Sequence, residues 1–114
     1  MNAEDDTPAC PLPKPPDFAS VERLSLHPDP APADYREAMR LADAEARARF
    51  GEDWMLLSWY DRDRDFESPQ HASECHADSA IPGYVDYGLN HGARLMVDIG
   101  DGRFVFFYRP VELD

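Results

Sequence analysis

Residue types that bind transition metals or take part in acid–base catalysis gather in one short segment after Pro69. Ser68 followed by Pro69 is a favourable helix start, so we predict a short helix over 69–77. On such a helix His71 and Cys75 lie one turn apart on the same face. An imidazole and a thiolate placed in this way can hold one Zn²⁺ together with a third ligand. This predicts a metal-binding domain or metalloenzyme, with the candidate ligands His71, Cys75, His76 and His91.

Glu74 and Asp78 belong to the same polar segment and could help to bind a metal, a ligand or a partner. The spacing matches neither paired C-x-x-C nor H-E-x-x-H, so two other interpretations stay open. In the first, the helix is a solvated polar helix and Cys75 packs inward as a small apolar residue. In the second, Cys75 is a nucleophile, which the dipole at the C-terminal end of the helix would oppose. Zinc is the one cofactor that these residues suggest.

A second group of candidate residues follows in the chain. A helix from Pro82 to His91, ended by Gly92, would place Tyr84, Tyr87 and His91 on one face, where they could line a small-molecule pocket. Tyrosine and histidine on one helix face are, however, more often core side chains with satisfied polar tips. Further on, two arginines are expected to be cross-strand neighbours, a pair that needs an acid or an anionic ligand between them. These residues predict a small-ligand sensor, with Arg94 and Arg109 as the anion-binding pair.

The clearest element that could position these groups is a helix over 34–50. Asp34 with Glu37 resembles a capping box, and Gly51 suits the left-handed position that ends a helix. Apolar side chains recur at spacings of three and four, which predicts a core-facing stripe of Tyr35, Met39, Ala42, Ala46 and Phe50. On the outer surface we expect i,i+4 ion pairs, namely Asp43 with Arg47 and Glu45 with Arg49.

Three strands complete the predicted framework. Residues 54–60 are apolar on both alternating faces, which is typical of a strand covered on both sides, and we expect the charged run 61–65 after it to be solvated. Asp101-Gly102 is a type I′ turn signal between strands 93–100 and 103–109. That turn sets the register, so we predict the cross-strand pairs Leu95–Tyr108, Met96–Phe107, Val97–Phe106, Asp98–Val105 and Ile99–Phe104.

The chain before residue 33 differs in composition from the rest. Eight of the 11 prolines lie in residues 1–32, so we expect a flexible, acidic, proline-rich leader there and a single α+β domain over 33–114. Within the leader, residues 20–26 alternate and could add an edge strand to the domain. The predicted fold is a small, mainly antiparallel sheet packed against helix 34–50, with short helices in the connection 66–92. We expect either that connection or a homodimer partner to cover the second face of the sheet.

The overall charge limits the classes of partner. The net charge is −12, which would repel phosphate backbones and anionic lipid headgroups, so we expect no nucleic-acid or membrane binding. The first residues lack the features of a secretory signal, and two cysteines make no disulfide framework, so we expect a cytoplasmic protein. Nucleotide-binding and hydrolase motifs are missing. Our leading hypothesis is therefore a non-enzymatic module that binds a protein partner or a second copy, with the metal-binding and ligand-sensor functions as alternatives.

Overall fold

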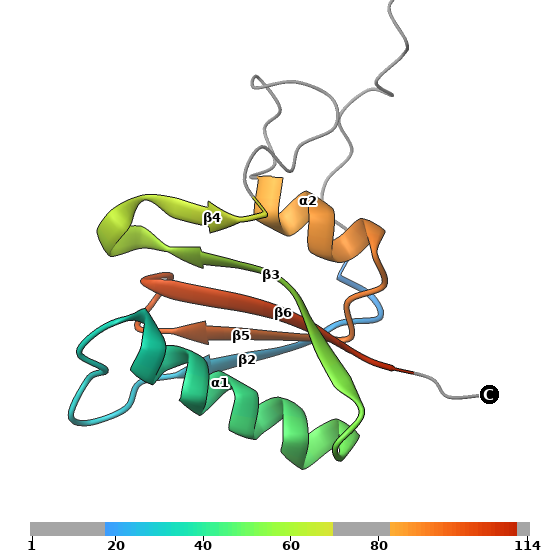
Figure 1. Ribbon diagram of the computed structural model, residues 1–114, viewed down its shortest axis with the longest axis horizontal. Helices are drawn as coiled ribbons and strands as arrows, with labels where there is room; N and C mark the ends of the chain where they lie inside the picture. Colours follow the sequence, from blue (N-terminus) through green and yellow to red (C-terminus); the bar gives the residue numbers. More distant parts are fainter. Residues whose placement is uncertain (1–17, 70–82, 112–114) are drawn as a thin grey trace, which may run out of the picture.

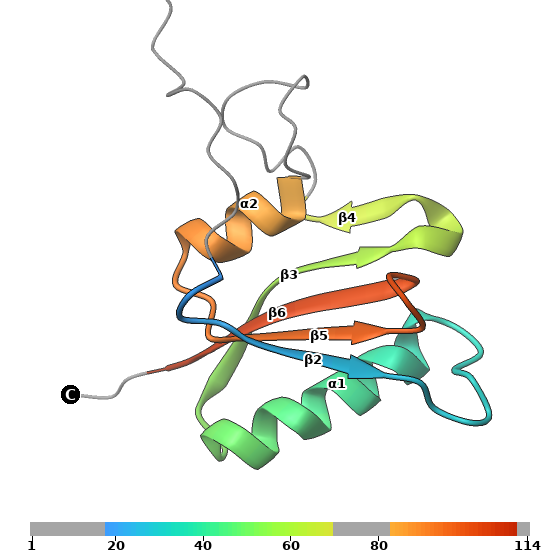
Figure 2. The ribbon, with the colours of Figure 1, turned by 180° about the vertical axis from the view of Figure 1, so that it is seen from behind.

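The computed structural model describes residues 18–69 and 83–111 of the chain. They form an α+β fold with a five-stranded sheet in the order β2-β5-β6-β3-β4. The strands are β2 (Glu22–Leu26), β3 (Trp54–Asp61), β4 (Phe66–Ser68), β5 (Leu95–Ile99) and β6 (Phe104–Pro110). Helix α1 (Tyr35–Phe50) covers one face and helix α2 (Gly83–Asn90) lies on the other, as Figures 1 and 2 show. The predicted fold class is confirmed.

Helix α1 begins where the sequence predicted, because Asp34 caps it. Oδ1 of Asp34 accepts hydrogen bonds from the backbone N–H groups of Arg36 at 3.0 Å and Glu37 at 3.2 Å. The Glu37 carboxylate completes the cap by accepting from the N–H of Ala33 at 2.8 Å. At the other end Gly51 adopts a φ of 75°, and its N–H bonds the carbonyl of Arg47. A residue with a side chain would be strained at that φ.

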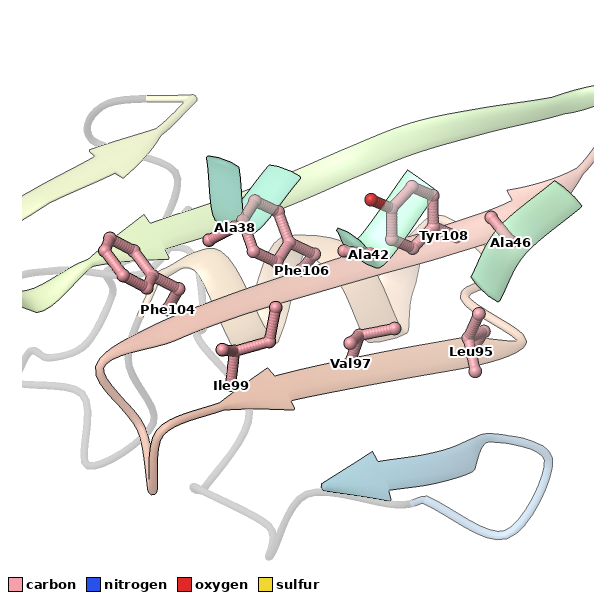
Figure 3. Packing of buried hydrophobic residues seen from close by; sticks show 9 residues of the cluster. All are labelled: Ala38, Ala42, Ala46, Leu95, Val97, Ile99, Phe104, Phe106 and Tyr108. Carbon is pink, nitrogen blue, oxygen red and sulfur yellow. The ribbon is translucent and has the colours of Figure 1, made fainter. Parts of the chain in front are cut away.

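The main core lies between α1 and the sheet (Figure 3). The buried residues of α1 are three alanines, whereas the larger residues predicted for this stripe are only partly buried at its margins. Small side chains let the helix backbone approach the large rings of β6 closely. The prediction missed Ala38, and the cluster comprises Ala38, Ala42, Ala46, Leu95, Val97, Ile99, Phe104, Phe106 and Tyr108.

One of the two ion pairs predicted on the outer surface of α1 forms. The Nη1 atom of Arg49 lies 2.7 Å from Oε1 of Glu45, as the i,i+4 spacing predicted. Asp43, by contrast, accepts a hydrogen bond of 2.7 Å from the hydroxyl of Tyr108, and Arg47 lies 3.7 Å from a carboxylate oxygen of Glu52. The predicted Asp43–Arg47 pair is therefore wrong, because a buried phenol takes the Asp43 carboxylate.

The hairpin of β5 and β6 has the predicted register at all five cross-strand pairs. Its turn is also of the predicted kind, since Asp101 and Gly102 both have positive φ, at 54° and 88°. The N–H of Arg103 closes the turn on the carbonyl of Gly100 at 3.2 Å. In addition, Oδ1 of Asp98 accepts from the N–H of Gly102 at 2.6 Å. Local turn chemistry thus determines how the two central strands pair.

Strand β3 is confirmed, but the charged run after it is not simply solvated. Asp61 ends β3 with 2% of its surface exposed, on the face that α1 covers. Its carboxylate accepts from Nε of Arg64 at 2.7 Å and from the N–H of Asp63 at 3.0 Å. A short 3₁₀ helix, η1 (Arg62–Arg64), then returns the chain as β4, which pairs antiparallel with β3. The prediction of a solvated run is therefore wrong for Asp61, because the turn directs the N–H of Asp63 and the guanidinium of Arg64 onto its carboxylate.

Strand β2 confirms the edge strand expected over 20–26, and it pairs parallel with β5. The sheet therefore takes in a segment that precedes residue 33. On the second face, α2 packs over β3, β4 and β6. It ends at Asn90, one residue before the predicted end, and Gly92 beyond it has a φ of 88°. Ser68, expected to cap a helix, is the last residue of β4. The predicted helix over 69–77 lies almost entirely outside the described residues.

Candidate functional site

Most of the candidate metal ligands lie outside the described residues: His71, Cys75 and His76, together with Glu74 and Asp78. The zinc site therefore stays a prediction. His91 is described: its ring stacks on Tyr87 with the centroids 3.8 Å apart, and its Nδ1 lies 2.8 Å from the Tyr87 carbonyl oxygen. Within 18–69 and 83–111, no three His, Cys, Asp or Glu side chains are grouped so that they could hold a metal ion.

The structure brings together two residues that lie close to the two ends of this segment, Glu67 and Tyr84. Oε1 of Glu67, in β4, accepts a hydrogen bond of 3.1 Å from the N–H of Tyr84, in the first turn of α2. A carboxylate at a helix N-terminus satisfies an unpaired N–H and interacts favourably with the helix dipole. The Tyr84 carbonyl in turn accepts from the buried hydroxyl of Ser58 at 2.6 Å. The start of α2 is therefore fastened to both β3 and β4.

The aromatic candidates on α2 divide between two places. Tyr84 stacks on Tyr60 of β3, with the ring centroids 4.9 Å apart and the planes 6° from parallel. Tyr87 instead stacks on His91, at the far end of the helix. Burial raises the pKa of Tyr84 to about 12, and the neighbouring Tyr60 and two carboxylates add to the effect. Tyr84 is thus a protonated phenol near neutral pH, suited to packing and hydrogen bonding.

The two candidate arginines of the anion pair lie where β5 begins and β6 ends. The N–H of Arg94 bonds the carbonyl of Tyr108 at 2.8 Å, while its side chain is exposed. Nη1 of Arg109 donates to the carbonyl of His91 at 3.2 Å, just past the end of α2. A cation there is stabilised by the negative end of the helix dipole. Arg109 therefore has a structural contact of its own in the described part of the chain.

A different feature of the sheet exposes groups able to bind another chain: the outer edge of β2. In a parallel pair, alternate residues direct both backbone groups to the neighbouring strand. Glu22 donates its N–H to the carbonyl of Arg94 at 3.0 Å, and the carbonyl of Leu26 accepts from Gly100 at 3.0 Å. These two bonds set the alternation, so the N–H and C=O groups of Arg23 and Ser25 point away from β5. In the described ranges no strand pairs with that edge.

Apolar side chains lie beside this edge on the face that carries α1. Leu24 and Leu26 are partly buried and pack against the main core, while Leu41 of α1 is 39% exposed. Leu41 begins a helical row that continues through Glu45 to Arg49, and Arg49 reaches β2, so the row faces the edge strand. We call the set Arg23, Leu24, Ser25, Leu26 and Leu41 the β2 edge surface.

An ion-pair network anchors the β2 edge surface to α1. Arg49 donates from Nε and Nη2 to the two carboxylate oxygens of Glu22, both at 2.9 Å, and Nη1 also donates to Glu45. The hydrogen bonds from Arg49 lower the pKa of the Glu22 carboxyl and raise the pKa of the guanidinium. The sequence indicated the Glu45–Arg49 pair by its spacing. No local signal indicates Glu22, which lies 27 positions from Arg49.

Comparison with known proteins gives the fold and the family. The chain is similar to the crystal structure of the protein AF1514 from Archeoglobus fulgidus DSM 4304, with a TM-score of 0.63 and 22% sequence identity over 82% of this chain and 99% of that chain. This likeness shows a shared fold. No curated protein matches.

In residues 18–69 and 83–111, neither helix has the length and apolar character needed to span a membrane.

The family model described as "Domain of unknown function (DUF5619)" matches residues 21–108, a range that begins directly before β2 and ends within β6. Because the match spans most of the chain, the protein belongs to the DUF5619 family.

Proposed function

We propose that this protein is a non-enzymatic binding module that recognises a protein partner along the β2 edge surface. The observation that carries the proposal is the outward direction of the backbone groups of Arg23 and Ser25 at a sheet edge. An extended segment of another chain can pair with such an edge, gaining affinity from main-chain hydrogen bonds. Stable proteins usually shorten, cover or bend an edge strand that pairs with no partner, so an edge left open suits the binding of another chain.

The side chains of the β2 edge surface support the same proposal. A strand added at the edge would place alternate side chains beside Leu24 and Leu26, on the face of the sheet that also carries the exposed Leu41. Burial of this apolar area adds to the backbone hydrogen bonds, at roughly 25 cal/mol per Å² removed from water. The other edge strand, β4, has only three residues and offers a shorter template.

The proposal is tested by replacing Arg23 with a photo-crosslinking residue in the full chain and irradiating cells that produce it. We expect a discrete adduct from position 23 and none from Arg40, an exposed position on α1. Adding Ser25→Pro removes an N–H that points outward and should abolish the adduct, while Ser25→Ala keeps the N–H and the adduct. Equal adducts from both positions, or an adduct that survives Ser25→Pro, would contradict the proposal.

The polar segment provides a second control. If the β2 edge surface binds the partner, His71→Ala and Cys75→Ala should leave the position-23 adduct unchanged. Loss of the adduct in both variants would mean that the function depends on the segment in which the sequence predicted a zinc site, and the proposal would fail.

A further inference from the structure

We infer that the partner seated on the β2 edge surface is a second copy of this chain, paired antiparallel through β2. This inference rests on the proposed function above, and it identifies the protein partner that binds there. A dimer with a two-fold axis uses the same patch on both subunits, so the patch must be complementary to itself. The β2 strand meets that condition in one register, which follows from the alternation along its five residues.

Complete overlap of Glu22–Leu26 with its copy places the two-fold axis at Leu24. Arg23 then lies opposite Ser25 of the second copy, and both residues direct their backbone groups outward. In an antiparallel pair, two such residues exchange both N–H···O=C bonds. The axis generates the pair twice, so the four outward groups of one copy meet the four of the other.

Other registers are less favourable for reasons that the same residues supply. After a shift of one residue, the outward backbone groups of one copy lie opposite residues whose N–H and C=O groups already bond β5. The hydrogen-bond ladder between the copies then cannot form. A shift of two residues in one direction brings Arg23 opposite Arg23 of the second copy, and like charges in direct opposition are destabilising. The shift of two residues in the other direction places Arg23 opposite His27, which lies beyond the strand.

The apolar side of the edge also becomes complementary in the register centred on Leu24. A two-fold axis normal to the sheet keeps both α1 helices on the same face. The Leu24 side chains of the two copies then face each other at the axis, as a non-hydrogen-bonded pair with Cα atoms about 4.5 Å apart. Leu41, 39% exposed in the single chain, begins the α1 row that faces β2 and lies on the same face of the sheet as this pair in each copy.

Disulfide trapping tests this register directly. In the full chain with Cys10→Ser and Cys75→Ser, Leu24→Cys should form a disulfide-linked dimer on mild oxidation, because a disulfide spans Cα separations of about 4.4–6.8 Å. Leu26→Cys is the matched control, since both positions are partly buried leucines of β2 on the same face. In the inferred dimer the two Leu26 positions are four residues out of alignment, about 13 Å along the strand. Leu26→Cys should therefore give no disulfide-linked dimer under the same oxidation.

Sedimentation equilibrium of the untagged protein gives an independent readout. We expect a reversible monomer–dimer equilibrium for the parent protein and for Ser25→Ala, and a monomer for Ser25→Pro at the same concentrations with an unchanged circular dichroism spectrum. A monomeric parent, or equal trapping of Leu24→Cys and Leu26→Cys, would overturn the second copy as the partner. In that case a position-23 adduct with a different protein would leave the proposed function standing, and the lack of any edge-dependent adduct would end both.

Discussion

Arg49 holds Glu22 by two hydrogen bonds of equal length, 2.9 Å, which join the edge strand β2 to helix α1. The fork of the guanidinium matches the two carboxylate oxygens, a geometry that a lysine cannot reproduce. This contact matters for the proposed interface because it fixes β2, and with it the outward groups of Arg23 and Ser25, relative to Leu41.

The loss of unfolding free energy at acidic pH should depend on Glu22. Arg49 lowers the pKa of this carboxyl in the folded protein, so its contribution is present above the unfolded pKa, about 4.3, and is lost as the pH falls through the folded value. We expect Glu22→Gln to lower the free energy of unfolding at neutral pH and to match the parent in acid. Urea unfolding at a series of pH values measures this. Glu52→Gln, at a largely exposed carboxylate 3.7 Å from Arg47, is the control and should show little effect.

Gly88 should not accept a side chain. A Cβ at this position would lie 2.8 Å from Cγ and 2.9 Å from Cβ of Phe107, which is fully buried and cannot move aside. We expect Gly88→Ala to destabilise the fold by about 1–3 kcal/mol despite the better helix propensity of alanine. Combining it with Phe107→Ala, which removes the close ring atoms Cγ and Cδ2, should cost less than the sum of the two single changes in urea unfolding. A Gly88→Ala variant more stable than the parent would contradict the close packing of α2 on β6.

The hydroxyl of Tyr108 should contribute to the attachment of α1. It is fully buried and donates to Asp43 at 2.7 Å, and burial together with this carboxylate raises the pKa of the phenol. We expect Tyr108→Phe to cost about 1.5–3 kcal/mol of unfolding free energy, as for other hydrogen bonds to charged groups. Asp43→Asn keeps an acceptor oxygen and should cost less. Equal stability of Tyr108→Phe and the parent would show that this bond does not stabilise the helix–sheet contact.

Tyr84 should contribute to the loss of stability in alkaline solution. Its folded pKa, about 12, exceeds the ordinary value of 10, so its contribution is complete below about pH 10 and is lost as the pH rises through 12. We expect Tyr84→Phe to flatten this loss, measured as thermal midpoints from pH 9 to about 12. Tyr87→Phe, outside the Tyr60 stack, is the control and should keep the alkaline slope of the parent. An identical slope in Tyr84→Phe would refute the burial of this phenol.

The elements predictable from the sequence are those with local causes. The Asp101-Gly102 turn determined the hairpin register, and Asp34 and Gly51 determined the ends of α1. Asp61 was misjudged because a run of alternating charges is usually solvated, whereas here η1 folds Arg64 back onto the buried carboxylate. The short strand β4 follows from that same turn.

Non-local relationships account for most of the remaining differences. The parallel pairing of β2 with β5 joins segments more than 70 positions apart, and the Glu22–Arg49 contact depends on it. The β2 edge surface was therefore not predictable, although the alternation in residues 20–26 indicated the strand itself. Ala38 was missed because the predicted stripe followed its larger neighbour Met39, yet Ala38 is fully buried in the main core. The predicted zinc ligands His71, Cys75 and His76 lie outside the described residues and stay a prediction.

The most direct test of the β2 edge surface is amide hydrogen exchange, residue by residue, at low and high protein concentration. Leu24 donates inward to β5, so its amide should be protected at both concentrations. The amides of Arg23 and Ser25 point outward and should exchange fast in dilute protein and become protected as the second copy pairs. If Arg23 and Ser25 exchange equally fast at every concentration while Leu24 stays protected, β2 is a free edge in the purified protein and does not pair with a second copy.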